Sequence, residues 1–261
     1  MSAAHEDLLD IAISAALAAG AFLTERFAAG QEVATASKST PTDLVSQADI
    51  ETERLIRGML AERRPDDAVM GEEGDDRPGT TGLRWVVDPL DGTIDFLYGI
   101  PQWSVSVAVE DASGAALAGV VFDPLRDELF AATIEGPPTL NGVPLSRREA
   151  PADLGAALVA TGFGYAAQVR AAQAEVVAAV LPRVRDIRRF GSAALDLAWT
   201  AAGRCDAYYE RGTKRWDVAA GALICERAGL VVEPLAAQGV LPDGQLVAPA
   251  ALIGPLRALV G

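Results

Sequence analysis

The sequence lacks several side chains on which many enzymes depend, beginning with histidine, of which His5 is the single example. A histidine-based catalytic triad or a histidine-rich zinc site is therefore disfavoured. The two cysteines, Cys205 and Cys225, lie far apart and form no Cys-x-x-Cys pair, so we interpret them as buried, reduced thiols. Any metal site must then be built from oxygen ligands, which favours Mg²⁺, Mn²⁺ or Ca²⁺.

Positive charge is also scarce, because 22 Lys and Arg residues stand against 36 Asp and Glu residues and give a formal charge of −14. This excess argues against direct binding of nucleic acid or of an anionic membrane, since both need a basic surface. The longest apolar tract, residues 11–23, is too short to span a bilayer, and acids rather than bases precede it. The sequence therefore predicts a cytoplasmic protein without a membrane span or signal peptide.

Half of the 261 residues are apolar, which is enough for one large domain or two fused lobes. Residues 5–28 predict a helix, and a second helix is predicted from Ser46 to about residue 63, with Ser46 and Asp49 as a capping box. Residues 31–45 between them predict a loop or loose hairpin. Strands are predicted at residues 68–70, 85–87, 103–109, 115–122 and 127–133. The first half thus predicts two helices packed on an antiparallel sheet.

Strands and helices alternate in the second half of the chain. The predicted strands are residues 156–161, 186–190, 206–210, 230–233 and 245–248, and the predicted helices are 166–181, 191–202, 216–228 and one from Pro249. This alternation predicts a mostly parallel or mixed sheet with helices on both faces. We find no repeat or long linker, so a lobe of residues 1–145 and a lobe of residues 146–261 are expected to share an interface as one catalytic unit.

The stretch Trp85-Val-Val-Asp-Pro-Leu-Asp-Gly-Thr-Ile-Asp-Phe96 is where chemistry is concentrated. Its first residues predict a short buried strand. Pro89 has no backbone N–H and is expected to end strand pairing, so that Asp88 and Asp91 leave the sheet together. Two carboxylates at such a point are typical of a turn when seen alone, but they also suit a divalent cation.

The residues that follow, and two distant acids, strengthen that hypothesis. Gly92 permits a close approach to the backbone, and Thr93 is expected to cap a helix whose N–H groups face an anion. Glu72 follows a predicted strand and Asp217 lies in the first turn of a predicted helix. Each acid alone is more often a solvated or capping residue. If they converge, their mutual repulsion would be costly without cations, so the combination indicates a metal-dependent phosphate-ester site.

These segments resemble the inositol monophosphatase family. The stretch Trp85–Phe96 resembles the family's first signature, and Trp216-Asp-Val-Ala-Ala-Gly221 resembles its second. Further segments that fit the family are Lys38–Asp49, Gly71–Glu73, Gly191–Ala193 and Asp206–Glu210. The resemblance covers nearly the whole chain and implies an α+β fold layered α-β-α-β-α, with an antiparallel N-terminal sheet and a mixed C-terminal sheet. It also implies a homodimer and Mg²⁺-dependent phosphomonoesterase activity.

The resemblance assigns roles to residues of this chain. The ligands of two or three Mg²⁺ ions, or of Mn²⁺, would be the side chains of Glu72, Asp88, Asp91 and Asp217 and the carbonyl of Leu90. Thr93, oriented by Asp49, and Glu72, acting through water on the metal, would prepare the nucleophile. The amides of Gly92 and Thr93 would hold the phosphate. The alcohol would face Asp91, Gly191, Ser192, Ala193 and Glu210, and Lys38 would lie on a loop over the site.

Asp95 and Lys214 leave alternatives open, and Tyr98 is a further departure from the family pattern. Asp95 stands where the family frequently has Asn, and we interpret it as a helix-start acid, the alternative being an effect on metal affinity. Tyr98 stands where His is frequent. Lys214 is interpreted as a solvated neighbour of an acidic site, the alternative being a contact with substrate.

The leading functional hypothesis is hydrolysis of myo-inositol 1-phosphate, because a carboxylate such as Glu210 can accept hydrogen bonds from a polyol. Histidinol phosphate, fructose 1,6-bisphosphate and adenosine 3′,5′-bisphosphate are alternative substrates, since a shared metal core cannot choose between them. A second class of function is a protein-binding accessory factor in RNA synthesis. A non-catalytic cation-binding domain is disfavoured because Thr93, Asp49 and Glu72 are all present.

Overall fold

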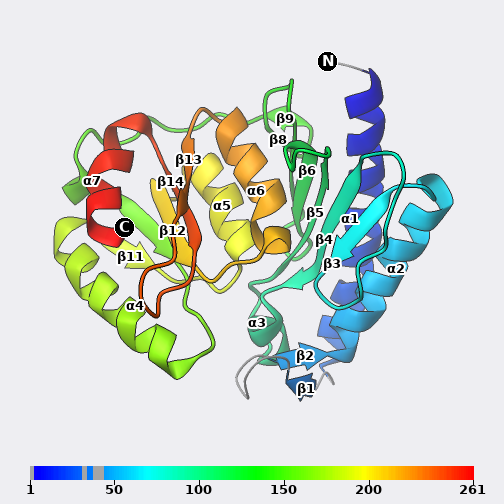
Figure 1. Cartoon of the computed structure of the whole chain (residues 1–261), viewed down its shortest axis with the longest axis horizontal. Coiled ribbons are helices and arrows are strands. Elements are labelled where there is room, and N and C mark those ends of the chain that lie inside the picture. The colour runs from blue at the N-terminus through cyan, green and yellow to red at the C-terminus, as the bar shows by residue number, and fades with distance from the viewer. Residues whose placement is uncertain (1–2, 31–33, 38–43) are drawn as a thin grey trace.

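The computed structural model describes residues 3–30, 34–37 and 44–261, so Lys38 lies outside the described residues. Helices and sheets alternate in five layers, with two outer pairs of helices, two sheets and a central pair of helices between the sheets (Figure 1). The layered α-β-α-β-α fold is as predicted from the sequence. Residues from the two halves of the chain face each other across the boundary between the first sheet and the central helices.

The first sheet has seven strands in the order β3-β4-β5-β6-β7-β8-β9. Its strands are β3 (Ala68–Gly71), β4 (Arg84–Asp91), β5 (Ser104–Glu110), β6 (Ala116–Asp123), β7 (Glu128–Thr133), β8 (Thr139–Leu140) and β9 (Val143–Pro144). All neighbouring pairs are antiparallel except β3 and β4, which are parallel. The prediction of an antiparallel sheet is therefore correct for every pair but the first.

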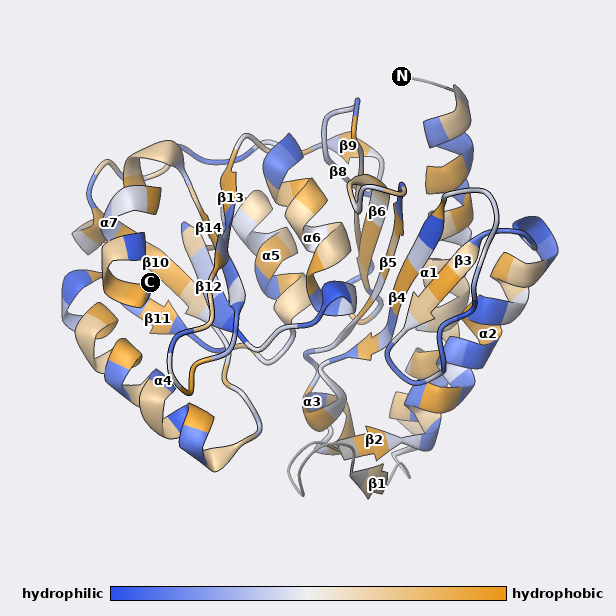
Figure 2. Ribbon diagram, in the orientation of Figure 1, coloured by the Kyte–Doolittle hydropathy of each residue, from blue (hydrophilic) through white to orange (hydrophobic). Residues whose placement is uncertain are grey.

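Two long helices, α1 (Ala3–Ala29) and α2 (Gln47–Arg63), cover the outer face of this sheet, and hydrophilic residues mark the exposed side of α2 (Figures 1 and 2). A small antiparallel pair, β1 (Ala34–Ser37) and β2 (Leu44–Ser46), precedes α2. Ser46 is the N-cap of α2, where its side chain and that of Asp49 form the predicted capping box.

Helix α1 is more apolar over a greater length than the sequence tract suggested. Among the helices that the structure describes it alone, over Ala4–Ala29, has the length and composition that could cross a membrane. Its buried side chains, which include Leu8, Ile11 and Leu23, belong to the same core as Val105 of β5 and Val120 of β6. This packing against the sheet accounts for the apolar composition, as in the core helix of a globular protein.

The second sheet has five strands in the order β11-β10-β12-β14-β13. The elements of this half are β10 (Leu158–Thr161), β11 (Asp186–Arg188), β12 (Ala207–Arg211), β13 (Val231–Leu235), β14 (Gly244–Ala248), α4 (Ala167–Val180), α5 (Ala193–Ala201), α6 (Arg215–Arg227) and α7 (Ala250–Val260), with short 3₁₀ turns at Leu154–Ala156 and Leu181–Arg183. Strand β10 is parallel to β11 and β12, whereas β14 is antiparallel to β12 and β13, so the sheet is mixed as predicted.

The central layer is formed by α5 and α6, which pack on both sheets at once. Val86 of β4, Leu197 of α5 and Tyr208 of β12 belong to one buried cluster that joins the two halves. All nine residues of α5 are buried, as expected for a helix with apolar layers on both sides. A Cβ at Gly119 of β6 would lie 2.9 Å from the Cα of Ala220 in α6, so glycine is needed there for close helix–sheet packing.

Strand β4 corrects one prediction, because strand pairing does not end at Pro89. The strand continues to Asp91, and its register against β5 shifts between Asp88, which faces Ser106, and Asp91, which faces Ser104. Three steps along β4 therefore match two steps along β5, which is the extra residue of a β-bulge. Pro89 lies within this bulge, where proline is tolerated inside a sheet.

Candidate metal and phosphate site

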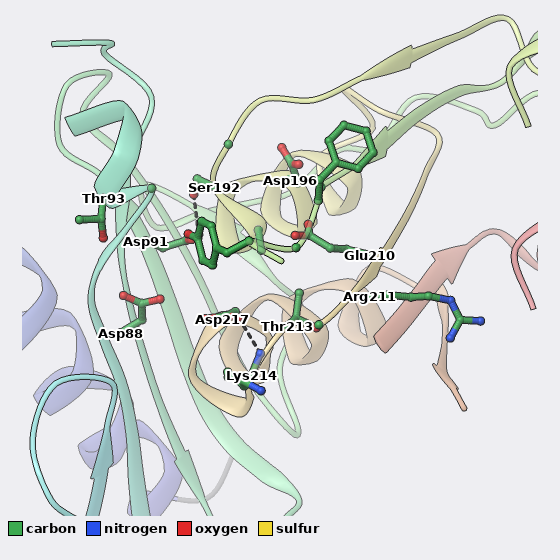
Figure 3. A pocket seen from close by; sticks show the side chains of 18 of the residues that line it. Asp88, Asp91, Thr93, Ser192, Asp196, Glu210, Arg211, Thr213, Lys214 and Asp217 are labelled. Atoms are coloured by element: carbon green, nitrogen blue, oxygen red, sulfur yellow. Dashed lines mark hydrogen bonds between the residues drawn. The ribbon is translucent and has the colours of Figure 1, made fainter. Parts of the chain in front are cut away.

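The predicted site residues meet around a cavity of about 360 Å³ between the two halves of the chain. The N-terminal half contributes Glu72, Asp88, Leu90, Asp91, Gly92 and Thr93, and the C-terminal half contributes Gly191, Ser192, Ala193, Glu210 and Asp217. Figure 3 shows Asp88, Asp91 and Thr93 on one side of the cavity and Glu210 on the other. Asp49 is not part of the cavity wall but lies behind Thr93, to which it is hydrogen-bonded. The structure therefore brings together all the predicted site residues that it describes.

The bulge in β4 places both aspartates on the cavity side of the sheet. Side chains alternate along a regular strand, so Asp88 and Asp91, three positions apart, would otherwise face opposite ways. With one residue inserted, Leu90 joins the outer core that contains Val87, and Asp91 returns to the face of Asp88. The backbone N–H of Leu90 donates a 3.0 Å hydrogen bond to Asp88 Oδ1, which holds the bulged segment.

Asp91 is fixed by the first turn of α5 on the opposite half of the chain. Its Oδ2 accepts a 2.6 Å hydrogen bond from the Ser192 hydroxyl and a 2.7 Å hydrogen bond from the backbone N–H of Ala194. Ser192 is also the N-cap of α5 and lies 3.1 Å from the hydroxyl of Ser104 in β5. Ser192, predicted to face substrate, thus also orients a predicted metal ligand.

The prediction that Thr93 caps a helix is wrong. The N-cap of the five-residue helix α3 (Thr93–Leu97) is Gly92, whose φ of 97° is a conformation that favours glycine. The Thr93 Oγ1 lies 2.9 Å from Asp49 Oδ1 and 3.1 Å from the carbonyl oxygen of Leu90, so its single proton has two acceptors within reach, of which Asp49 is the nearer. The hydroxyl proton can therefore be held by Asp49, whose other oxygen accepts two hydrogen bonds from Ser46.

Asp217 is held at the start of α6, where its Oδ2 accepts a 2.6 Å hydrogen bond from the backbone N–H of Lys214. Arg215, which directly follows Lys214, forms an ion pair with Glu110 at the buried end of β5. Ser106 of β5 donates a 3.2 Å hydrogen bond to the carbonyl oxygen of Trp216. These contacts anchor the first turn of α6 to the first sheet. Lys214 itself is exposed and lines the cavity.

The electrostatics of the acids show the cost of gathering them. Burial raises the pKa of Asp88 well above its ordinary value, and the charges of Glu72 and Asp91 raise it further. Burial, Asp91 and Glu72 likewise raise the pKa of Asp217 well above its ordinary value. Burial raises the pKa of Asp91 to about 6, although the hydrogen bonds from Ser192 and Ala194 oppose the rise. Desolvation by burial is the largest cause in all three, and repulsion between the carboxylates adds to it.

An all-oxygen, multiply charged donor set of this kind fits Mg²⁺, which prefers carboxylates and retains water ligands. Within the described parts of the chain no three acidic, thiol or imidazole side chains are already drawn around one point as a metal cluster. The four acids, Glu72, Asp88, Asp91 and Asp217, instead line one cavity and repel each other. Bound divalent cations would offset this repulsion between the carboxylates.

The opposite wall of the cavity carries Glu210, at the end of β12. The Tyr208 hydroxyl donates a 3.1 Å hydrogen bond to Glu210 Oε2. A Cβ at Gly162 would overlap the Glu210 carboxylate, so glycine at that position makes room for it. Burial, followed by the charge of Asp91, raises the pKa of Glu210 to about 7. Glu210 can therefore change its charge near neutral pH.

Sequence reasoning missed Asp196, which lines the same cavity from α5 and is only 1% exposed. Its Oδ1 has no hydrogen-bond partner among the described residues, and burial and Glu210 raise its pKa well above the ordinary value. An aspartate inside the otherwise apolar run of α5 is the signal that could have revealed it. Arg189, which also lines the cavity, was missed as well, because nothing in its local pattern distinguishes it from a surface arginine.

Asp95 lies in the first turn of α3, as interpreted from the sequence, but its side chain is buried. A Cβ at Gly191 would overlap Asp95 Oδ2, and the φ of 107° at Gly191 also requires glycine. Burial raises the pKa of Asp95, and the charge of Arg189 opposes the rise. Asp95 is thus packed against the segment predicted to face substrate and is no solvated surface acid.

The chain is similar over most of its length to known proteins. The model described as the inositol monophosphatase family matches residues 4–258. The chain is similar to the inositol-1-monophosphatase of Mycobacterium leprae, with 46% identity over 82% of this chain and 76% of that protein. It is also similar to the Nus factor SuhB of Pasteurella multocida, with 38% identity over 93% of this chain and 91% of that protein. The crystal structure of the extragenic suppressor protein suhB from Bartonella henselae superposes with a TM-score of 0.89 and 32% identity, covering 97% of this chain and 98% of that chain.

Proposed function

Because the chain belongs to the inositol monophosphatase family, a family of phosphatases, we propose that it is a Mg²⁺-dependent hydrolase of a small phosphate monoester, with myo-inositol 1-phosphate as substrate. The observation that carries the proposal is the convergence of Glu72, Asp88, Asp91 and Asp217 on one desolvated cavity, where burial and the neighbouring acids raise the pKa values of Asp88 and Asp217. In this proposal these four side chains and the Leu90 carbonyl hold two or three Mg²⁺ ions, and Mn²⁺ can replace them.

Bound Mg²⁺ would offset the carboxylate and phosphate charges and would make a water molecule easier to deprotonate. The protein supplies orientation. Ser192 and the Ala194 N–H fix Asp91, and Asp49 orients the Thr93 hydroxyl at the cavity wall. In this proposal Thr93 accepts a proton from the attacking water while passing its own to Asp49, and Glu72 serves as a second base.

The start of α3 is the proposed phosphate position. Gly92 and Thr93 line the cavity beside Asp91, so their backbone can approach a phosphoryl group near the acids that would carry the ions. Substitution of Gly92 is excluded by close packing as well as by its φ, because a Cβ there would lie 2.8 Å from the carbonyl oxygen of Gln102. The backbone at this point is thus fixed before substrate binds.

The proposed alcohol position is formed by Asp91 of the N-terminal half together with Gly191, Ser192, Ala193 and Glu210 of the C-terminal half. A Glu210 carboxylate accepts hydrogen bonds from hydroxyl groups, and its Tyr208 partner restricts its orientation. Asp196 also lines the cavity, and burial raises the pKa values of both carboxyl groups, so each can donate as well as accept a hydrogen bond with a hydroxyl group. Two such groups suit an alcohol with several hydroxyls, which supports inositol phosphate as the proposed substrate.

A hydrolysis panel tests the proposal. Purified protein is given Mg²⁺ and, separately, myo-inositol 1-phosphate, histidinol phosphate, fructose 1,6-bisphosphate and adenosine 3′,5′-bisphosphate, and released phosphate is measured. We expect the highest kcat/KM with inositol phosphate and complete loss of activity in EDTA. Rapid cleavage of another member of the panel without turnover of inositol phosphate would replace the substrate, and undiminished activity in EDTA would overturn the metal dependence.

A second candidate function, protein binding in RNA synthesis, is favoured by the similarity to a protein named a Nus factor. Tyr98 and Ile100, 75% and 46% exposed, offer an apolar surface on the turn after α3. Pull-down from lysate with the wild type and Asp88→Asn separates the two functions, because a binding role would persist in a variant without turnover. The cytoplasmic location and homodimer that we also propose are tested by fractionation and by light scattering of the purified protein.

A further inference from the structure

Glu53 is a buried carboxylate that the proposed reaction does not use. It lies in α2, is 2% exposed, and faces the turn between β3 and β4. Its Oε2 accepts a 2.7 Å hydrogen bond from the backbone N–H of Glu73, and its Oε1 accepts a 2.8 Å hydrogen bond from that of Gly74. Both donors directly follow Glu72 in the chain. The Glu53 carboxylate is therefore hydrogen-bonded to the backbone of the turn that carries a proposed metal ligand.

Arg57, one helical turn further along α2, completes this contact. Its Nε donates a 2.7 Å hydrogen bond to Glu53 Oε1, and its Nη2 donates a 3.2 Å hydrogen bond to the carbonyl oxygen of Gly74. The buried charge of Glu53 is thus compensated by an arginine and by two backbone N–H groups, as a stable buried carboxylate requires. Glu53 and Arg57 together hold a donor and an acceptor of the same turn.

The two glycines that flank Glu72 and Glu73 are explained by the same contact. A Cβ at Gly71 would lie 2.5 Å from Glu53 Cδ, and a Cβ at Gly74 would lie 2.8 Å from Glu53 Oε1. Neither glycine has a positive φ, so the requirement is for space and not for an unusual backbone conformation. The sequence Gly-Glu-Glu-Gly at residues 71–74 therefore admits the Glu53 carboxylate into contact with the backbone.

Helix α2 also carries Asp49, four positions before Glu53. Residues four apart lie on the same face of a helix, so one face of α2 holds both the partner of Thr93 and the partner of the Glu72 turn. A small displacement of this helix face would move two proposed catalytic groups together. The helix is anchored at its start by the capping box of Ser46 and Asp49.

We propose that Glu53 is a positioning residue that sets the metal affinity of the site by holding the 71–74 turn so that Glu72 reaches the cavity. The inference rests on the proposed role of Glu72 as a metal ligand. Loss of a group that hydrogen-bonds to a metal ligand and orients it typically weakens metal binding about 10- to 100-fold. A carboxylate bound to two consecutive N–H groups is such a group, acting through the backbone of the ligand.

The test measures metal binding itself, without substrate, by the electron paramagnetic resonance signal of free Mn²⁺ during titration of purified protein. Glu53→Gln can satisfy one of the two N–H donors but not both, and it loses the charge that pairs with Arg57. We expect at least tenfold weaker Mn²⁺ binding. Gly74→Ala, which displaces the carboxylate without removing it, is expected to weaken Mn²⁺ binding in the same way.

Asp206→Asn is the matched control for loss of a buried, paired carboxylate. Asp206 is 1% exposed, accepts a 2.8 Å hydrogen bond from the Leu158 N–H and pairs with Arg148 at 2.7 Å, away from the cavity lining. We expect it to lower the Tm as Glu53→Gln does while leaving Mn²⁺ affinity unchanged.

The outcomes separate the inference from the function on which it rests. Wild-type affinity in Glu53→Gln, or in Gly74→Ala if Glu53→Gln fails to fold, overturns the role of Glu53 alone. Equal loss of affinity in Asp206→Asn reduces the effect to general destabilisation and also overturns it. A wild-type protein that does not bind Mn²⁺ removes the proposed metal site, and with it this inference.

Discussion

The hydroxyl of Thr93 lies 2.9 Å from Asp49 Oδ1, so residues 44 positions apart in the sequence share a buried hydrogen bond beside the acid-lined cavity. Asp49 retains two hydrogen bonds from Ser46 through its other oxygen. The aspartate therefore stays compensated if Thr93 is replaced, and a change at Thr93 should affect chemistry more than folding.

Removal of the Thr93 hydroxyl is the first prediction. Thr93→Val keeps the shape of the side chain but loses the proton-carrying group, so we expect kcat to fall by roughly 10²- to 10⁴-fold at saturating Mg²⁺. Thr93→Ser, which restores a hydroxyl, should recover most of the activity. Steady-state kinetics on both variants measure this, with Mn²⁺ binding as the control that the metal ligands are intact. A Thr93→Val enzyme with wild-type kcat would exclude the hydroxyl from the reaction.

Metal addition should stabilise the folded protein. The repulsion among Asp88, Asp91 and their neighbours is present only in the fold, so Mg²⁺ binds the native state in preference to the unfolded chain. At a free Mg²⁺ concentration of 100 times Kd the gain is about 2.7 kcal/mol. Thermal unfolding in EDTA and in Mg²⁺ measures it. Asp88→Asn should be more stable than the wild type in EDTA and should respond less to Mg²⁺, whereas an equal Tm shift in both proteins would contradict the ligand assignment.

The pH dependence of stability should carry a contribution from Glu210. Its pKa is raised from 4.5 to about 7 by burial and then by Asp91, so the folded state holds a proton that the unfolded chain has released over that interval. The stability contributed by this group is greatest below about pH 4.5 and falls as the pH rises to 7 and beyond, by on the order of 3 kcal/mol.

Urea unfolding of wild type and Glu210→Gln in EDTA, at pH 5 and pH 8, isolates that contribution from those of the other buried acids. We expect the variant to lose less stability between the two pH values. Identical pH dependence in the two proteins would show that Glu210 ionises in the fold as it does in the unfolded chain.

Gly162→Ala should separate recognition of the alcohol from cleavage of the phosphate. The new Cβ would overlap the Glu210 carboxylate and displace it. We expect a raised KM for inositol phosphate, whereas p-nitrophenyl phosphate, whose leaving group has no polyol hydroxyls, should be cleaved as before. Gly254→Ala in α7, where a Cβ meets nothing within 4 Å, is the control. Equal losses on both substrates would contradict a role for Glu210 in binding the alcohol.

The parts of the fold that follow local rules could be predicted from the sequence. The Ser46–Asp49 capping box begins α2 as expected, and the strand–helix alternation of the second half produces a mixed sheet. The course of β4 could not be predicted, because a proline after an aspartate usually ends a strand, and only the pairing with β5 shows that a bulge absorbs it. Tertiary pairing here overrides a local signal.

The site divides in the same way. Residues in compact motifs, such as Asp88 and Thr93, reach the cavity as the motif indicated. Asp196 interrupts the apolar run of α5, but that signal gives no direction, and only the fold shows that the side chain lines the cavity. Glu53 was missed because its local pattern is that of an ordinary helix residue, and its importance arises only from the turn that the fold places opposite it. The relation between Glu53 and the turn at residues 71–74 is a long-range contact that no periodicity encodes.

The bulge between Asp88 and Asp91 determines on which face of the sheet the Asp91 side chain lies. A substitution between them changes one side chain, but a one-residue deletion would restore the regular alternation of β4 and turn Asp91 away from Asp88. We therefore expect a one-residue deletion between Asp88 and Asp91 to damage the site more than a conservative substitution at Pro89 or Leu90. The number of residues between the two acids, more than their identity, thus decides whether both carboxylates face the cavity.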